Sequence, residues 1–219
     1  MNGTAPHVLA PRAAIQADPL RFGVGARITV SVMSDDYVDI ILGAIAAADT
    51  TGLVVSTGDV STYLGGAETD LLRAITDLAA GVAATGAHAS IAVHLSRGCP
   101  GEAACELPGG AGPREVAVPE GRTTGRFAAA EWALYPLADD SVAGVEPDHM
   151  RDIVAAIELA RANGTFRASE HFVTRLEGDL GDVLATALAG WVLVGRSVQH
   201  VTSHLTISVN SPSHADVRG

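Results

Sequence analysis

The sequence predicts an α+β protein with two ferredoxin-like domains in tandem, each with the element order βαββαβ and an antiparallel sheet. The first observation behind this prediction is an internal repeat. Residues 36–100 align with residues 148–212 at a constant offset of 112 without a gap, and 15 of the 65 pairs are identical. Asp, His and Pro coincide as well as Ala and Gly, so we interpret the repeat as a duplication. The second observation is that both copies show the same order of strand-like and helix-like patterns.

In the first copy, alternating β-branched residues predict a strand over 26–33, and apolar residues at helical spacing predict a helix over 35–49. A Gly-Asp pair between two short apolar runs predicts a β-hairpin over 52–66. A second amphipathic helix over 67–86 and a last strand over 87–96 complete the unit.

The second copy repeats this order. The expected elements are a strand over 126–137, a helix over 146–162, a hairpin over 164–178, a helix over 179–195 and a strand over 197–209. An extra segment, ADDSVAGV at 138–145, lengthens the loop between the first strand and the first helix of this copy.

These patterns divide the chain into four parts. We expect a flexible N-terminal arm over 1–21, a first ferredoxin-like repeat over 22–101, a linker over 102–125 and a second repeat over 126–214. The linker is rich in Gly and Pro and has no periodicity, and its length suggests that it crosses a surface.

Composition and charge narrow the function. With 47% hydrophobic residues the chain can bury a core. Its formal charge of -11 argues against a nucleic-acid partner, because such binding depends on Lys and Arg. An acidic surface suits a cationic small molecule, although many proteins have one without any such ligand. No apolar run is long enough for membrane insertion, and the first residues do not read as a secretion signal, so we expect a cytoplasmic protein.

The repeated phrase VSTYLGG and FVTRLEG is the strongest site candidate. It places Thr62 and Thr174 at the same position in the second strand of each hairpin, two residues before Leu64 and Leu176. Residues two apart in a strand share a face, so each hydroxyl lies among apolar groups and needs a hydrogen-bond partner. Thr is also common in strands for packing reasons alone.

Carboxylates gather where the first strand of each copy meets its helix: Asp35 and Asp36 in the first copy, and Asp139, Asp140 and Asp148 in the second. Helix capping accounts for one Asp per helix, here Asp36 and Asp148. The additional carboxylates either attract a cationic ligand or are simply solvated.

Histidine and cysteine give weaker signals. His88 and His200 coincide in the repeat, but Ala92 stands where the second copy has His204, so a repeated metal site is not supported and we expect no metal. Cys99 and Cys105 could form a bridge in a Gly/Pro loop, but two thiols make neither a disulfide framework nor a zinc site. No phosphate-binding loop or activated nucleophile is recognisable, which favours binding over catalysis.

Several motifs resemble one known family. They are MSDDYVDIILGAIAAADTTGLVVSTGDVSTYLGG, GCPGE, ALYPL, EPDHM and NSPS, spread in order over residues 22–214. Together they are similar to the YkoF family of thiamin/hydroxymethylpyrimidine-binding proteins. The resemblance implies two tandem ferredoxin-like domains, a homodimer, one pocket per repeat for the aminopyrimidine of thiamin, and a role beside an ABC transporter. It implies no catalytic residue and no cofactor.

The same resemblance implies site residues. The strand-borne hydroxyl of the family falls on Thr62 and Thr174, and the first-strand positions that face the pyrimidine fall on Val30 and Leu134. Tyr135 joins the second site, where the first copy has Ser31 instead. This substitution and the 138–145 insertion bear on whether the two sites bind the ligand with equal affinity.

Three hypotheses follow. The first is a non-enzymatic binder of thiamin or its hydroxymethylpyrimidine precursor. The second is a regulatory module of the same fold that senses another metabolite, because this fold has many functions. The third is an enzyme acting on a thiamin precursor, with Cys99 or His88 as its reactive group.

Overall fold

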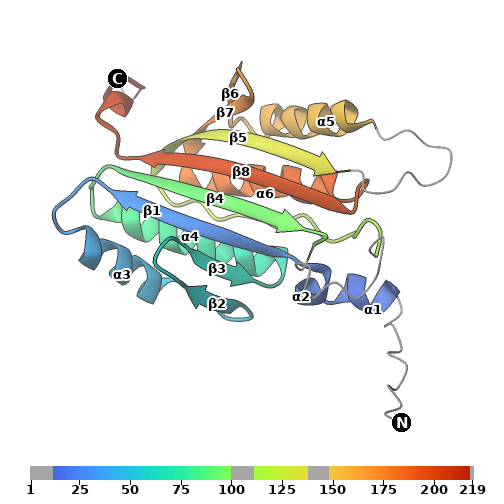
Figure 1. Ribbon diagram of the computed structural model, residues 1–219. Coiled ribbons are helices and arrows are strands. Elements are labelled where there is room, and N and C mark those ends of the chain that lie inside the picture. Colours follow the sequence, from blue (N-terminus) through green and yellow to red (C-terminus); the bar gives the residue numbers. More distant parts are fainter. Residues whose placement is uncertain (1–11, 100–110, 138–147, 218–219) are drawn as a thin grey trace, which may run out of the picture.

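The computed structural model describes residues 12–99, 111–137 and 148–217 (Figure 1). The first repeat consists of β1 (Gly25–Val32), α3 (Tyr37–Ala47), β2 (Val54–Thr57), β3 (Thr62–Gly65), α4 (Glu68–Ala84) and β4 (Ala89–Arg97). The second consists of β5 (Phe127–Leu137), α5 (His149–Ala162), β6 (Phe166–Glu170), β7 (Val173–Asp179), α6 (Leu180–Val194) and β8 (His200–Val209). Each repeat therefore has the order βαββαβ, and the predicted fold class is confirmed.

The two repeats share one sheet. Its eight strands run in the order β2-β3-β1-β4-β8-β5-β7-β6, and all neighbouring pairs are antiparallel. Each half has the ferredoxin-like strand order, and the halves join through their last strands, β4 and β8. This edge-to-edge junction leaves neither last strand exposed as an unpaired edge.

The junction has local two-fold symmetry. Val93 pairs with Leu205, and Leu205 is also the residue that corresponds to Val93 at the offset of 112. The local two-fold axis therefore passes through this pair. Asn210 donates to the carbonyl of Ala87, and Gln199, the counterpart of Ala87, donates to the carbonyl of Gly98. The duplication is thus preserved in the packing as well as in the sequence.

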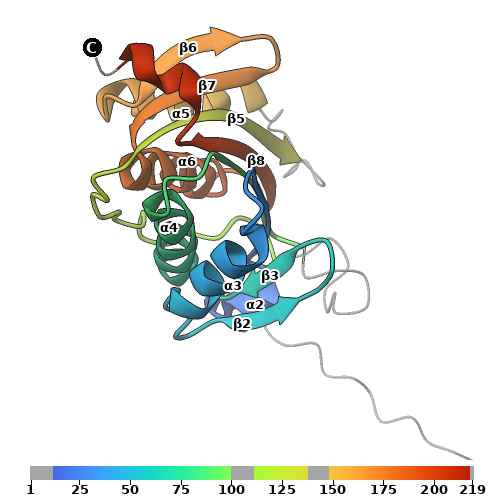
Figure 2. The same ribbon diagram turned by 90° about the vertical axis from the view of Figure 1, so that its left-hand side faces the viewer.

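All four long helices cover one side of the sheet, and the other side is open along the described part of the chain (Figure 2). The buried core lies between the sheet and α4 and α6, and includes Trp132 and Trp191. The end of the linker passes over this helix layer, where Arg122 pairs with Asp77 of α4. Among the described residues, no helix combines the length and the apolarity needed to cross a membrane.

The second half of the expected N-terminal arm is ordered. We expected a flexible arm up to residue 21. The structure instead has two short helices there, α1 (Arg12–Ala17) and α2 (Pro19–Phe22). Ile15 and Phe22 are buried, and Gln16 donates to the linker carbonyls of Ala111 and Pro113. The prediction was wrong here because the segment is too short and too weakly patterned to show its apolar contacts in the sequence.

A buried charged cluster lies beside this arm. Arg114 of the linker pairs with Glu68 at the start of α4, and Arg97 lies nearby with no exposed surface. Burial lowers the pKa of Arg97 to about 10, although the Glu68 carboxylate opposes that shift. Since Val209 is the counterpart of Arg97, this cluster exists at one end of the sheet and not at the symmetric one.

Candidate functional site

Thr62 and Thr174 occupy the same place in the two halves of the sheet. Thr62 on β3 pairs with Ile28 of β1, and Thr174 on β7 pairs with Trp132 of β5. Each threonine is 7% exposed and lies on the helix-facing side, in line with the buried Leu64 and Leu176. The expectation of a hydroxyl among apolar neighbours therefore describes both positions.

Each threonine has a second hydroxyl across the hairpin. Thr57 pairs with Thr62, and their Oγ1 atoms lie 3.2 Å apart and share a hydrogen bond. Ser169, the counterpart of Thr57, pairs with Thr174, but within the described part of the chain the Thr174 hydroxyl makes no hydrogen bond. The Thr174 oxygen is not among the fully buried unpaired atoms of the described structure, so it keeps some access to solvent. Thr174 is therefore available to bond a ligand.

The predicted first-strand residues lie on the same side of the sheet. Val30 and Leu134 are half-buried, follow the buried Ile28 and Trp132 by two positions, and pack against the core. On this side of the sheet, the structure thus brings together one hydroxyl and one first-strand apolar residue in each repeat.

Apolar side chains of α3 and β2 in the first repeat remain exposed. Helix α3 packs on β1 and α4 and buries only Ala44. Val38 and Leu42, one turn apart on α3, are 47% and 59% exposed, and Val55 on β2 is 42% exposed. Exposed apolar groups of this kind are typical of small-molecule sites.

The second repeat also has three exposed apolar residues on its first helix and its hairpin. Met150 and Val154 of α5 are exposed, and Phe172 at the hairpin tip is 95% exposed. Phe172 has a φ of 69°, a left-handed conformation that is strained for a bulky residue.

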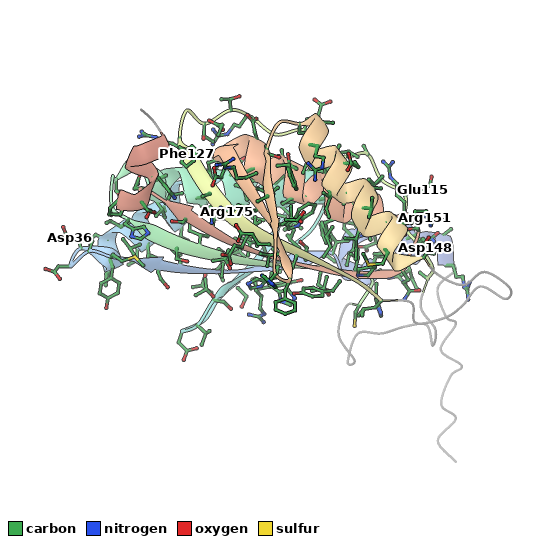
Figure 3. All side chains as sticks on the ribbon, turned by 90° about the horizontal axis from the view of Figure 1, so that it is seen from above. Asp36, Glu115, Phe127, Asp148, Arg151 and Arg175 are labelled. Carbon is green, nitrogen blue, oxygen red and sulfur yellow. The ribbon has the colours of Figure 1, made fainter. Side chains whose placement is uncertain are left out.

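The acidic residues lie at the two ends of the molecule. Asp36 precedes α3 and Asp148 precedes α5, and Figure 3 shows them far apart. Asp148 caps α5 by accepting from the Arg151 N–H at 2.9 Å, as expected, whereas the exposed Asp36 accepts no such bond. Asp35 is also exposed. Asp139 and Asp140 lie outside the described residues.

Tyr135 does not join the other predicted residues. It follows Leu134 directly in β5, so its side chain points to the open side of the sheet, where it pairs with Thr202 and is half exposed. The structure therefore places Tyr135 across the sheet from Thr174, because adjacent strand residues alternate between faces.

A hollow of about 400 Å³ lies elsewhere, between α3 and α4. Its lining residues are Asp39, Ile40, Gly43, Ala44 and Ala47 of α3 together with Gly81 and Thr85. At the counterparts of Gly43, Ala47 and Gly81, the second repeat has Ala155, Leu159 and Leu193. Larger residues therefore stand at these positions in the second repeat.

The histidine and cysteine candidates do not come together in one site. His88 and the exposed free thiol Cys99 stand beyond opposite ends of β4, so they cannot act on one substrate atom. Within the described residues, no group of three or more His, Cys, Asp and Glu side chains is placed to hold a metal. Cys105 lies outside the described residues.

Known proteins provide an independent comparison. The model of the YKOF-related family matches residues 23–102 and 127–214, once in each repeat. The chain belongs to this family. It is also 30% identical over 189 residues, 86% of this chain and 91% of the relative, to the Bacillus subtilis (strain 168) protein named "Putative HMP/thiamine-binding protein YkoF". The YkoF resemblance seen in the motifs is confirmed.

The second hydroxyl of each hairpin was not predicted from the sequence. Thr57 and Ser169 are related by the same offset of 112, and both carry a hydroxyl, but they are not identical and so did not count as a match. A comparison by side-chain chemistry instead of identity would have found them.

Proposed function

We propose that this YkoF-family chain binds thiamin or its hydroxymethylpyrimidine precursor without transforming it, in one site per repeat. The observation that carries the proposal is the equivalent placement of Thr62 and Thr174, nearly buried on the helix-facing side, with the Thr174 hydroxyl unpartnered in the described structure. The name of the Bacillus relative supports this ligand class.

The chemistry of an aminopyrimidine suits these positions. Its amine donates and its ring nitrogens accept, and a threonine hydroxyl can do both. Val30 or Leu134 would flank the ring beside the hydroxyl, and the exposed Val38 and Leu42 would cover the first site. A few polar anchors among apolar walls are typical of small-molecule sites.

Charge has a secondary role in this proposal. The thiazolium of thiamin would lie toward Asp35 and Asp36 in the first site. Asp139 and Asp140, the carboxylates predicted for the second site, lie outside the described residues. Attraction between exposed charges contributes about 1 kcal/mol or less. The pyrimidine would therefore set the orientation of the ligand in the site, and the carboxylates would attract the thiazolium cation.

Calorimetric titration with thiamin, hydroxymethylpyrimidine and the thiazole alcohol tests the assignment. We expect binding of the first two, and Thr62→Ala and Thr174→Ala should each weaken one site about fivefold or more, since a hydrogen bond contributes about 1 kcal/mol. Thr202→Ala, on the open side of the sheet, is the matched control. Binding of the thiazole alcohol alone would contradict the proposal.

Fluorescence can separate the two sites. Both tryptophans, Trp132 and Trp191, belong to the second repeat, and Trp132 pairs directly with Thr174. A ligand in the second site should change the emission, and Thr174→Ala should remove this change while Thr62→Ala leaves it. Turnover of the ligand, followed by chromatography, would favour the enzymatic alternative instead.

The proposal includes a homodimer in the cytoplasm that supports uptake or salvage beside ABC-transporter components. The uncovered side of the eight-stranded sheet is the surface we assign to the second copy. Sedimentation at several protein concentrations tests the dimer independently of ligand binding.

A further inference from the structure

Both hairpins keep a hydroxyl group on each side of their turns. Thr57 and Thr62 flank the turn of the first hairpin, and their counterparts at the offset of 112, Ser169 and Thr174, flank the turn of the second. The residues between them all differ: the first repeat has Gly58, Asp59, Val60 and Ser61, and the second has Glu170, His171, Phe172 and Val173. The turn has therefore diverged completely, while both hydroxyl positions remain.

Sheet packing alone does not explain the second hydroxyl. Threonine is common in strands because its side chain is branched, and cross-strand threonine pairs stabilise sheets. Ser169 has no branch, so it shares with Thr57 the hydroxyl and not the shape of the side chain. Within the described structure, moreover, the Ser169 and Thr174 side chains make no hydrogen bond, so they do not tie the hairpin together.

Each hydroxyl pair lies on one side of its hairpin. Residues directly opposite each other on two strands point the same way, so Thr57 and Ser169 face the helix side together with Thr62 and Thr174. Thr62 and Thr174 are 7% exposed, whereas Thr57 and Ser169 are exposed. Each pair thus has one hydroxyl that solvent reaches freely and one that lies among apolar side chains.

The first pair offers one donor and one acceptor side by side. Its two Oγ1 atoms lie 3.2 Å apart and share one hydrogen bond. The hydroxyl that accepts this bond keeps its own proton, and the hydroxyl that donates it keeps its lone pairs. An aminopyrimidine presents the reverse on neighbouring atoms, a ring nitrogen that accepts and an amine that donates. A single hydroxyl would have to make both bonds through one oxygen.

We propose that each hydroxyl pair recognises this edge of the pyrimidine: Thr62 and Thr174 donate to the ring nitrogen, and Thr57 and Ser169 accept from the amine. This inference rests on the proposed function and adds Thr57 and Ser169 as residues that determine specificity for the amino group. The amine has two N–H groups, and beside an exposed hydroxyl the second one can bond water. The ring nitrogen accepts only one bond and so suits the nearly buried hydroxyl.

A cycle of variants and ligands tests these roles in the full chain. The two ligands are hydroxymethylpyrimidine and its analogue in which hydrogen replaces the amine. Thr57→Val, followed by calorimetry, and Ser169→Ala, followed by the tryptophan fluorescence of the second repeat, should each weaken hydroxymethylpyrimidine about fivefold or more at their own site. Neither should weaken the analogue by more than about twofold, because the contact to the amine is already missing. Thr174→Ala should weaken both ligands.

Two kinds of control accompany the cycle. Thr57→Ser and Ser169→Thr keep the hydroxyl and should bind within about twofold of wild type, since the hydrogen bond remains. Ser56→Ala should have no effect, because Ser56 pairs with Tyr63 and points to the other side of the hairpin from Thr57.

Three results would overturn the inference and leave the binding proposal intact. They are unchanged binding in Thr57→Val and Ser169→Ala, an equal loss for the two ligands, and a similar loss in the variants that keep the hydroxyl. A wild type that binds neither ligand would overturn both proposals. Urea unfolding of each variant shows that it is folded.

Discussion

The first helices of the two repeats, α3 and α5, occupy the same place in the fold but are held differently. Helix α3 begins without a side-chain cap and buries only Ala44. Helix α5 is capped by Asp148, buries Ala156 and Ala160, and is tied to the end of α6 by a hydrogen bond from Ser197 to Asp152. Duplication therefore preserved the backbone arrangement, while side-chain packing diverged around it.

The cores diverged in the same way. Ile28 and Leu78 in the first repeat correspond to Trp132 and Gly190 in the second. In the second repeat, the large Trp132 on the strand is combined with Gly190, which has no side chain, on the helix. In the first repeat, the smaller Ile28 is combined with Leu78. Because interiors are close-packed, each pair works only as a pair.

The largest expected effect comes from breaking one of these pairs. A Cβ at Gly190 would lie 2.4 Å from Trp132 Cη2, so Gly190→Leu must displace the indole. We expect the free energy of unfolding, measured in urea, to fall by about 2–3 kcal/mol. Adding Trp132→Ile, which recreates the Ile28 and Leu78 pair, should recover at least half of that loss.

Gly43→Ala is the control for this experiment, because nothing lies within 4 Å of a Cβ at that helical position. It should not lower stability. If the double variant were no more stable than Gly190→Leu alone, the two repeats would not be packed by interchangeable pairs.

A smaller effect concerns the second helices. Asp179 caps α6 by accepting from Gly181 N–H at 2.8 Å and also binds Thr124 and Gly125 of the linker, whereas its counterpart Ala67 leaves α4 without a side-chain cap. Asp179→Ala should lower the free energy of unfolding by about 1–2 kcal/mol at pH 7. Ala67→Asp should raise it by about 0.5–1 kcal/mol, since the extended backbone there suits a cap.

The Asp179 contribution should depend on pH. Burial opposes its ionisation, but the bonds from Thr124, Gly181 and Gly125 outweigh burial and hold the pKa below the ordinary value of 3.8. A lowered pKa means that the folded state favours the carboxylate, so the contribution is complete above that ordinary value and is lost as pH falls through the folded pKa. The gap between wild type and Asp179→Ala should therefore narrow in acid; a constant gap would mean that the cap acts without its charge.

The smallest effect concerns the hollow between α3 and α4, where the second repeat has larger residues at the counterpart positions. A Cβ at Gly81 would meet Ala44 at 3.4 Å, an ordinary contact, and Ala is a better helix former than Gly. We expect Gly81→Ala to raise the free energy of unfolding by about 0.5–1 kcal/mol. A loss of stability would show that α3 cannot accommodate even one methyl group.

Local patterns predicted most of the elements. The 3.6-residue and two-residue periodicities reflect which side of a helix or strand is buried, and the Gly58-Asp59 turn separates β2 from β3 as expected. The offset of 112 also located Thr62 and Thr174, because a duplicated fold puts counterparts at counterpart positions. Whether these positions bind thiamin stays a prediction.

By itself, then, the sequence determined the elements, their order, the duplication and the paired hydroxyls, since each of these depends on neighbours along the chain. Tertiary structure alone decided that β4 and β8 join the repeats into one sheet and that the segment around Ile15 packs on the linker. These features depend on contacts between residues that are distant in the sequence, and no local periodicity records which edges or surfaces will meet.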